Sequence, residues 1–158
     1  MRNDTEHLDD VITHQNHVRE NTIKIGKALF AIGRHDLGRR LIARGHVHDY
    51  DKFFGIQWKY MRKGNEMNTH MSLAIEEHVS TNSHHPEYHG SIHLMEELDI
   101  AELVCDWGAR STEFKTGLQE YIDGNAMEHH KFTKDDKVYK TIMYFKDMLC
   151  DKPFERKV

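Results

Sequence analysis

The sequence predicts an all-α protein that forms one domain, a helical bundle. Apolar residues recur mostly at spacings of three and four, the period of a helix with one buried face. No stretch shows the sustained alternation of apolar and polar residues that is typical of a β-strand. Only two prolines interrupt the chain, Pro86 and Pro153. A length of 158 residues is typical of one compact domain, and we expect residues 1–158 to form it.

The first two helices are indicated by an apolar stripe and by glycines that follow each helix. A long helix is expected over about residues 5–33, with Gly33 closing it. His14 lies on the apolar stripe, which places an imidazole among core residues. A second helix is expected over about residues 36–44, before Gly45. The stripe of the first helix comprises Val11, Val18, Ile25, Leu29 and Ile32.

The middle of the chain predicts two shorter helices followed by a turn. One helix is expected over about residues 52–62, where aromatic residues recur. After a polar loop, Asn68 or Thr69 can cap a helix that reaches about His78. Residues 81–90 combine turn-forming side chains with no helical period, so we expect a turn there.

The most regular helix is expected to begin at Asp99 as its N-cap. Asp99, Glu102 and Asp106 then form an acidic stripe beside the apolar one. Such a stripe is either an ordinary solvated face or a set of carboxylates that face a cation. The apolar stripe comprises Ile100, Leu103, Val104 and Trp107.

Two further helices complete the prediction. One is expected over about residues 112–122, before Gly124. Thr133 can cap the last one, expected over about residues 134–149. Neither internal repeats nor low-complexity segments occur.

The composition excludes several classes of protein. The chain has 22 Lys and Arg against 26 Asp and Glu, a net charge of −4, whereas domains that bind duplex nucleic acid are usually strongly basic. No apolar run approaches the roughly 20 residues that cross a membrane, and the acidic start does not resemble a secretory signal. Cys105 and Cys150 cannot build a disulfide framework, so we expect a cytoplasmic protein with reduced thiols.

Histidine is the unusual residue, with 14 copies spread along the chain. Because histidine is the commonest metal ligand, this count favours a metal site. An ionised carboxylate in the interior costs several kcal/mol unless a cation compensates it, and Asp106 borders an apolar face. Mixed nitrogen and oxygen ligands favour one or two divalent transition metals, namely Mn, Fe, Co, Ni or Zn. The candidate ligands are His14, His17, His48, Asp49, His78, His84, His85 and Asp106.

The order of these residues resembles the signature of the HD-domain metal-dependent phosphohydrolase superfamily. In that signature a histidine precedes a His-Asp pair, here His48-Asp49, and a later aspartate, here Asp106, completes the set. The tracts 48–53, 82–88 and 105–109 are similar to a family of small, functionally uncharacterised HD-like proteins of phages and bacteria. The resemblance covers about residues 14–123 and implies an HD-like helical bundle.

The resemblance also implies a role for each candidate. His48 and Asp49 are the implied central ligands and Asp106 the closing one. The first histidine is His14 or His17, and His14 is favoured because it lies on the buried stripe. Members with two metals add further histidines, which His78, His84 and His85 resemble.

Lys52 is similar to a phosphate-contacting lysine of the branch that hydrolyses cyclic dinucleotides. The sequence lacks the glycine before that lysine and the later Gly-Tyr-Pro motif of the branch, so the substrate does not carry over. Taken alone, a lysine at this position is more often a solvated residue.

The expected function is hydrolysis of a phosphoester or phosphoanhydride in a small phosphorylated substrate, with a nucleotide as the leading candidate. Asp49 would bridge two metals, Lys52 would neutralise phosphoryl charge, and His84 or His85 would donate a proton to the leaving oxygen. One alternative is a di-iron oxygenase on the same scaffold, and another is a non-catalytic metal-binding module. Cys105 is expected to be buried and inert.

The remaining histidines have ordinary interpretations. Taken alone, His14 and His17 are more often partly exposed helix residues than ligands. The His129-His130-Lys131 segment is expected to be a solvated surface or a basic rim for an anionic substrate.

Overall fold

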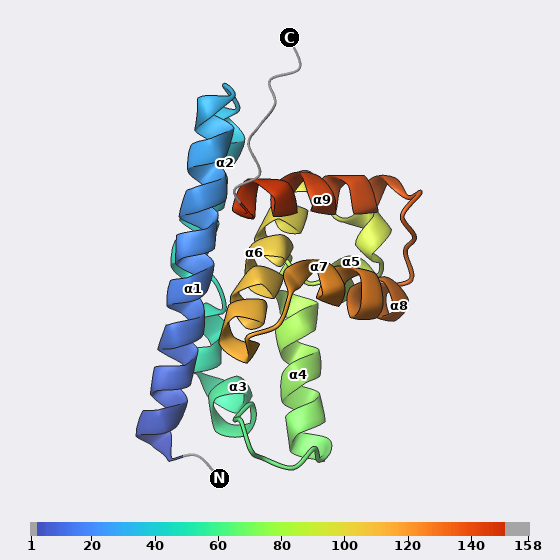
Figure 1. Ribbon diagram of the computed structural model, residues 1–158. Coiled ribbons are helices and arrows are strands. Elements are labelled where there is room, and N and C mark those ends of the chain that lie inside the picture. The colour runs from blue at the N-terminus through green and yellow to red at the C-terminus, as the bar shows by residue number, and fades with distance from the viewer. Residues whose placement is uncertain (1–2, 151–158) are drawn as a thin grey trace.

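The computed structural model describes residues 3–150, and this part of the chain consists of helices and turns without a strand (Figure 1). The prediction of an all-α fold is therefore confirmed. None of the described helices is both long enough and apolar enough to span a membrane.

Helix α1 (Asp4–Ala31) and helix α2 (His35–Val47) form a long hairpin at one side of the molecule (Figure 1). The Asn3 side chain caps α1 and Glu6 completes a capping box. Gly33, with φ 84°, reverses the chain between the two helices. The residues that α1 buries recur every three or four positions: His7, Val11, His14, Val18, Thr22, Ile25, Gly26 and Leu29.

Glycines allow α1 and α2 to pack closely. A Cβ atom added at Gly38 would lie 2.7 Å from the backbone oxygen of Gly26. A Cβ atom at Gly45 would overlap the side chain of Thr22. The close approach positions the end of α2 against the middle of α1, on the face that carries His14.

The segment after α2 is irregular. A 3₁₀ turn (Tyr50–Phe53) leads into helix α3 (Gly55–Tyr60), and helix α4 (Thr69–Thr81) follows after a loop. The Asn68 side chain accepts a hydrogen bond from the Met71 backbone, which confirms one of the two caps proposed for this helix. The single helix expected over 52–62 is wrong, because Phe54 is extended between the 3₁₀ turn and α3.

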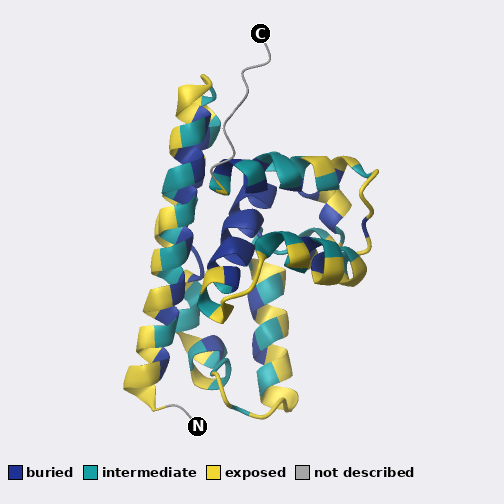
Figure 2. Ribbon diagram, in the orientation of Figure 1, coloured by how far each residue is buried: buried dark blue, intermediate teal, exposed yellow. Residues whose placement is uncertain are grey.

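Helix α6 (Glu97–Phe114) lies at the centre of the fold and is buried along nearly its whole length (Figure 2). Short helices α5 (Pro86–His89) and η2 (Ile92–Leu94) precede it, so the expected turn over 81–90 contains one helical turn. The N-cap position of α6 is Glu96 rather than the predicted Asp99. Asp99 lies in the first turn instead, where an acidic side chain is equally favoured by the helix dipole.

The last part of the chain packs across α6. Helix α7 (Leu118–Tyr121), a π-helical turn (Ile122–Ala126) and helix α8 (Met127–His130) form one continuous stretch, and helix α9 (Lys137–Leu149) follows.

Three predictions fail in this part of the chain. The helix expected over 112–122 is wrong because its first residues extend α6 until Lys115, whose left-handed conformation ends that helix. Gly124 does not end a helix either, since it lies within the π-helical turn. The N-cap of α9 is Asp136 rather than Thr133.

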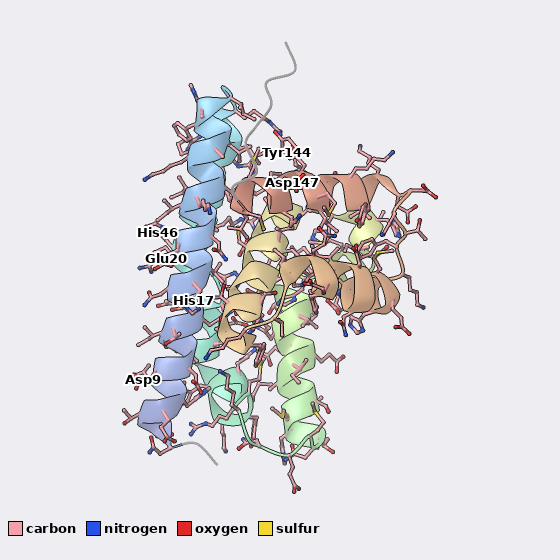
Figure 3. All side chains as sticks on the ribbon, viewed as in Figure 1. Asp9, His17, Glu20, His46, Tyr144 and Asp147 are labelled. Carbon is pink, nitrogen blue, oxygen red and sulfur yellow. The ribbon has the colours of Figure 1, made fainter. Side chains whose placement is uncertain are left out.

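An ion pair joins the hairpin to α6 and α9. The Arg34 guanidinium contacts the Glu97 carboxylate at 2.6 Å and lies 5.8 Å from the ring centroid of Tyr144, which Figure 3 labels on α9. Both groups of the ion pair are partly exposed, so this contact orients the helices more than it stabilises them.

We expect Gly38→Ala to destabilise the protein, because the added methyl group meets the rigid backbone of α1. The free energy of unfolding should fall by about 1–3 kcal/mol, measured by urea denaturation. Gly124→Ala is the matched control, since nothing lies within 4 Å of the added Cβ atom. It should leave stability unchanged or raise it slightly. Equal stability of the Gly38 variant and the wild type would contradict this packing.

Candidate metal centre

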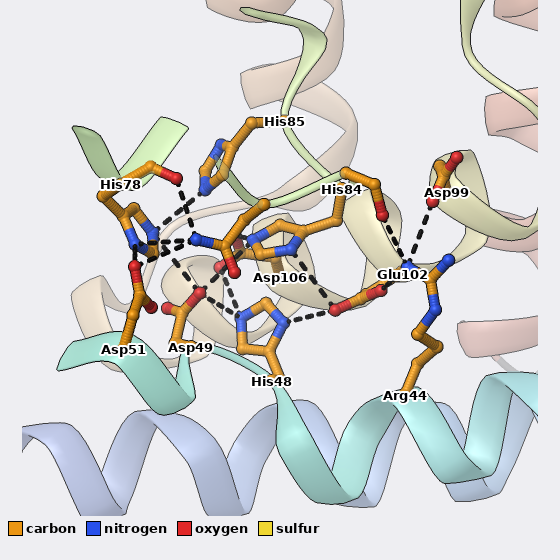
Figure 4. A network of polar contacts seen from close by, with 12 residues as sticks. Arg44, His48, Asp49, Asp51, His78, His84, His85, Asp99, Glu102 and Asp106 are labelled. Atoms are coloured by element: carbon orange, nitrogen blue, oxygen red, sulfur yellow. Dashed lines mark hydrogen bonds and ion pairs between the residues drawn. The ribbon is translucent and has the colours of Figure 1, made fainter. Parts of the chain in front are cut away.

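Histidine and aspartate side chains from four distant segments converge inside the fold (Figure 4). They come from α1, from the end of α2, from the α4–α5 region and from α6. Each is at most 7% exposed to solvent: His14, His48, Asp49, His78, His84 and Asp106.

Local backbone geometry directs His48 and Asp49 toward the same point. His48 leaves α2 in an extended conformation with ψ 131°. Asp49 then adopts the left-handed conformation with φ 54°, which is uncommon outside glycine but tolerated by aspartate. Adjacent side chains on a regular helix point in different directions. Because α2 ends here, the side chains of His48 and Asp49 can instead face the same point.

The contacts around Asp106 define one side of the centre. The Nε2 atom of His14 lies 2.9 Å from Asp106 Oδ1 and 3.7 Å from Asp49 Oδ2. The Nε2 atom of His48 lies 3.4 Å from Asp49 Oδ1 and 3.8 Å from Asp106 Oδ1. These four side chains therefore present nitrogen and oxygen atoms to a shared point.

A second set of ligand atoms shares Asp49 with the first. The Nε2 atoms of His78 and His84 lie 3.4 and 3.3 Å from Asp49 Oδ1. His85 Nε2 lies 3.1 Å from His78 Nε2. At this centre, three groups have ligand atoms that all lie within 4.8 Å of one another. They are His14–His48–Asp49, His48–His84–Asp106 and Asp49–His78–His84–His85.

The opposite nitrogen of each central imidazole faces a carboxylate. Glu113 Oε2 contacts His14 Nδ1 at 2.8 Å, and Asp51 Oδ2 contacts His78 Nδ1 at 2.8 Å. When the Nδ1 atom of a neutral imidazole donates its proton to such an oxygen, the Nε2 lone pair is available to a metal at the centre.

Glu102 orients two imidazoles at once (Figure 4). Its Oε1 atom lies 2.9 Å from His48 Nδ1 and 3.3 Å from His84 Nδ1. Its other oxygen accepts a hydrogen bond of 2.8 Å from Arg44, which also pairs with Asp99 at 3.1 Å. The carboxylate thus links two candidate ligands to a cation near the surface.

The residues present fit a divalent transition metal. No hydrogen bond of good geometry satisfies the buried Nε2 atoms of His14, His48 and His84 or the two oxygens of Asp49, whose polar contacts are with one another, Asp106 and Lys52. Buried polar atoms are rarely left unpaired, and these five face one another. A cation bound by imidazole and carboxylate would satisfy all of them.

The electrostatic balance supports this fit. Burial would raise the pKa of Asp49, yet the charges of His48 and Lys52 hold that pKa well below its usual range. Burial would likewise raise the pKa of Asp106, but a hydrogen bond from His14 and the charge of His48 keep it well below its usual range. Both carboxyl groups are therefore anionic at neutral pH.

In the absence of metal, protons on the histidines compensate these carboxylates. Burial alone lowers the pKa of His48, but the charge of Asp49 raises it to about 9. Hydrogen bonds to Asp49 and Glu102 overcome the burial of His84 and raise its pKa to about 10. Burial would raise the pKa of Glu102, and hydrogen bonds from both histidines instead lower it to about 2.

Lys52 lies between the centre and solvent. Its Nζ atom is 2.7 Å from Asp49 Oδ2, and its side chain is 14% exposed. Two cavities, of about 210 and 300 Å³, approach the centre, and Lys52 and Arg110 line both. An anion that enters either cavity therefore meets two cations beside the candidate ligands. The first cavity also reaches His14 and Asp49, and the second reaches His78, His85 and Asp106.

His17 does not join the other candidates. Its side chain is 29% exposed and its Nδ1 atom contacts Glu113 at 3.4 Å. It belongs to none of the ligand groups found among residues 3–150. His14, one turn earlier, is the histidine of α1 that reaches the centre.

Sequence reasoning missed the outer carboxylates. Glu102 was included only in an acidic stripe, and interpreting that stripe as a solvated face is wrong, because Glu102 and Asp106 are 3% and 7% exposed. Glu113, seven residues after Asp106, shares its helix face, so helical spacing could have found it. No pattern in the sequence marks Asp51.

Cys105 is fully buried, and burial raises the pKa of its thiol well above the usual value, as expected of an inert cysteine.

We expect metal uptake to release protons. At pH 7 the metal-free centre holds protons on His48 and His84, whose pKa values lie near 9 and 10, and ligation requires neutral imidazole. Metal affinity should therefore rise from pH 6 to pH 9, by up to about tenfold per pH unit for each proton displaced. Proton release on Zn²⁺ addition in weak buffer measures the effect. A pH-independent affinity without proton release would contradict it.

We expect Glu102→Gln to weaken metal binding about 10- to 100-fold, because a neutral amide cannot orient two imidazoles. Competition with a metal chelator measures the change. Glu20→Gln is the matched control, since Glu20 is an exposed residue of α1 (Figure 3). A folded Glu102 variant that binds metal as tightly as the control would overturn this role.

Comparison with known proteins identifies a family for this centre. Residues 3–151 match the DUF5662 family, described as a family of unknown function. Neither the curated proteins nor the solved structures contain a significant match. The matched range includes every residue of the candidate centre, from His14 to Glu113. Because the match spans nearly all of the sequence, the chain belongs to the DUF5662 family.

Proposed function

We propose that this protein is a metal-dependent phosphohydrolase related to the HD-domain superfamily. The observation that supports the proposal is the convergence of His14, His48, Asp49 and Asp106, whose imidazole nitrogens and carboxylate oxygens face one another at 2.9–3.8 Å. These residues follow the order of the superfamily signature. The proposed substrate is a small phosphorylated molecule, with a nucleotide as the leading candidate.

One or two divalent ions of Mn, Fe, Co, Ni or Zn would be held here. When bound, such ions supply Lewis-acid activation of water and of phosphoryl oxygens. Asp49 is shared by both candidate sets, so its two oxygens can serve two ions. The first set is His14, His48 and Asp49, with Asp106 in contact with both histidines, and the second is Asp49, His78, His84 and His85.

The cavities support an anionic substrate. Lys52 and Arg110 line both cavities beside the centre, and Arg62 and Lys63 line the smaller one. Positioned cations stabilise charge that develops on phosphoryl oxygens. We assign Lys52 to the phosphoryl group because it is the cation that contacts a candidate ligand directly.

The two adjacent histidines have different surroundings. His84 is enclosed, with Asp49 and Glu102 3.3 Å from its two nitrogens. His85 lines the larger cavity, where a leaving group can reach it. We therefore assign His84 to metal ligation. Burial and the charge of His84 lower the pKa of His85 to about 3, so its neutral imidazole suits the second ligand set rather than proton donation.

The proposal includes a cytoplasmic location. Cys105 and Cys150 are both free thiols, which is typical of a reducing compartment.

We expect metal-loaded protein to release phosphate from at least one member of a panel of nucleotides, cyclic nucleotides and phosphomonoesters, with Mn²⁺, Co²⁺ or Ni²⁺. The Asp49→Asn variant should lose its bound metal, and its turnover should fall at least 100-fold, because the substitution removes a shared anionic ligand.

The Lys52→Met variant should keep its metal, and its KM for the phosphorylated substrate should rise.

Three outcomes would contradict the function. They are an active Asp49 variant without metal, a fully loaded wild type that releases no phosphate from the whole panel, and oxygen-dependent turnover with iron. The last result would identify an oxygenase on this scaffold.

A further inference from the structure

A second cluster of ligand atoms lies where α5 meets the end of α8. Glu87, His129 and His130 each offer one atom, and these atoms lie within 4.8 Å of one another. All three line the larger cavity, whose inner wall includes the buried His78. The His129 side chain is 73% exposed, so the cluster occupies the outer end of the passage to the buried centre.

The chemistry of this cluster suits a borderline divalent cation. Two imidazoles and one carboxylate are a ligand set that zinc accepts with a position left open. His129 Nε2 lies 4.0 Å from Glu87 Oε1, which is too far for a hydrogen bond. A cation that binds between them would therefore not have to break one. Zinc bonds to nitrogen and oxygen are about 2.0–2.2 Å long, so one ion can join atoms about 4 Å apart.

One of the three ligands is already fixed. The His130 ring stacks on Trp107, with the ring centroids 6.0 Å apart. The His129 ring packs edge-to-face against His130, with the ring centroids 4.6 Å apart. Only the exposed side chains of His129 and Glu87 must adjust to close the site.

We propose that Glu87, His129 and His130 form a separate surface site for a divalent cation of the Zn²⁺ class. The ion joins α5 to α8. Because His85 immediately precedes α5, the ion fixes the segment that carries this residue of the buried centre. The site requires neither the buried centre nor its proposed activity.

The test is the number of ions retained by metal-stripped full-length protein after equilibrium dialysis against micromolar Zn²⁺. The wild type should retain one more ion per chain than His129→Ala or Glu87→Gln. His46→Ala and His70→Ala are matched controls, because both remove an exposed histidine elsewhere. They should retain as many ions as the wild type. Circular dichroism confirms that each variant is folded.

Two results would overturn the surface site. One is an equal ion count in the wild type and in both site variants. The other is an equal loss in the control variants, which would show that exposed histidines bind zinc without a defined site. A change in the affinity for inorganic phosphate in His129→Ala, with the zinc count unchanged, would identify an anion site and also contradict the proposal.

Discussion

Two carboxylates buried side by side, Asp49 and Asp106, require positive charge inside the protein, and the rest of the structure is arranged around that requirement. Ionised groups of one sign in the interior cost several kcal/mol each without compensation. The imidazoles of four histidines face these carboxylates, and the atoms between them that lack good hydrogen bonds form a set that a cation would complete. Protons on His48 and His84 compensate the charge when metal is absent.

Around Asp49 and Asp106, successive layers of side chains alternate in charge from the centre outward. Beyond the imidazoles lie Glu102 and Glu113, which accept from their Nδ1 atoms. Beyond these lie Arg44 and Arg110, at 2.8 and 3.1 Å from the two glutamates. This order ties α1, α2 and α6 to one point, so the centre contributes to the fold as well as to any chemistry. It also explains why acidic residues are tolerated on α6, which is buried along nearly its whole length.

Periodicity predicts the helices of this fold well where one face is buried throughout, as in α1. It fails where the backbone conformation of a single residue ends or divides a helix. Lys115 ends α6 in this way, and Phe54 divides the expected third helix. The inner candidate ligands could be selected from the sequence because each is a histidine or aspartate in a recognisable order, and the structure brings them together. Asp51 and Arg44 could not, since their roles depend on tertiary contacts that no spacing reveals.

Anomalous scattering from crystals grown with Mn²⁺ or Zn²⁺ tests the central claim most directly, because it locates an ion without requiring activity. The account predicts a strong peak within bonding distance of His48, Asp49 and Asp106. Crystals of folded protein that show no peak there at saturating metal, with the imidazoles hydrogen-bonded to the carboxylates instead, would contradict it.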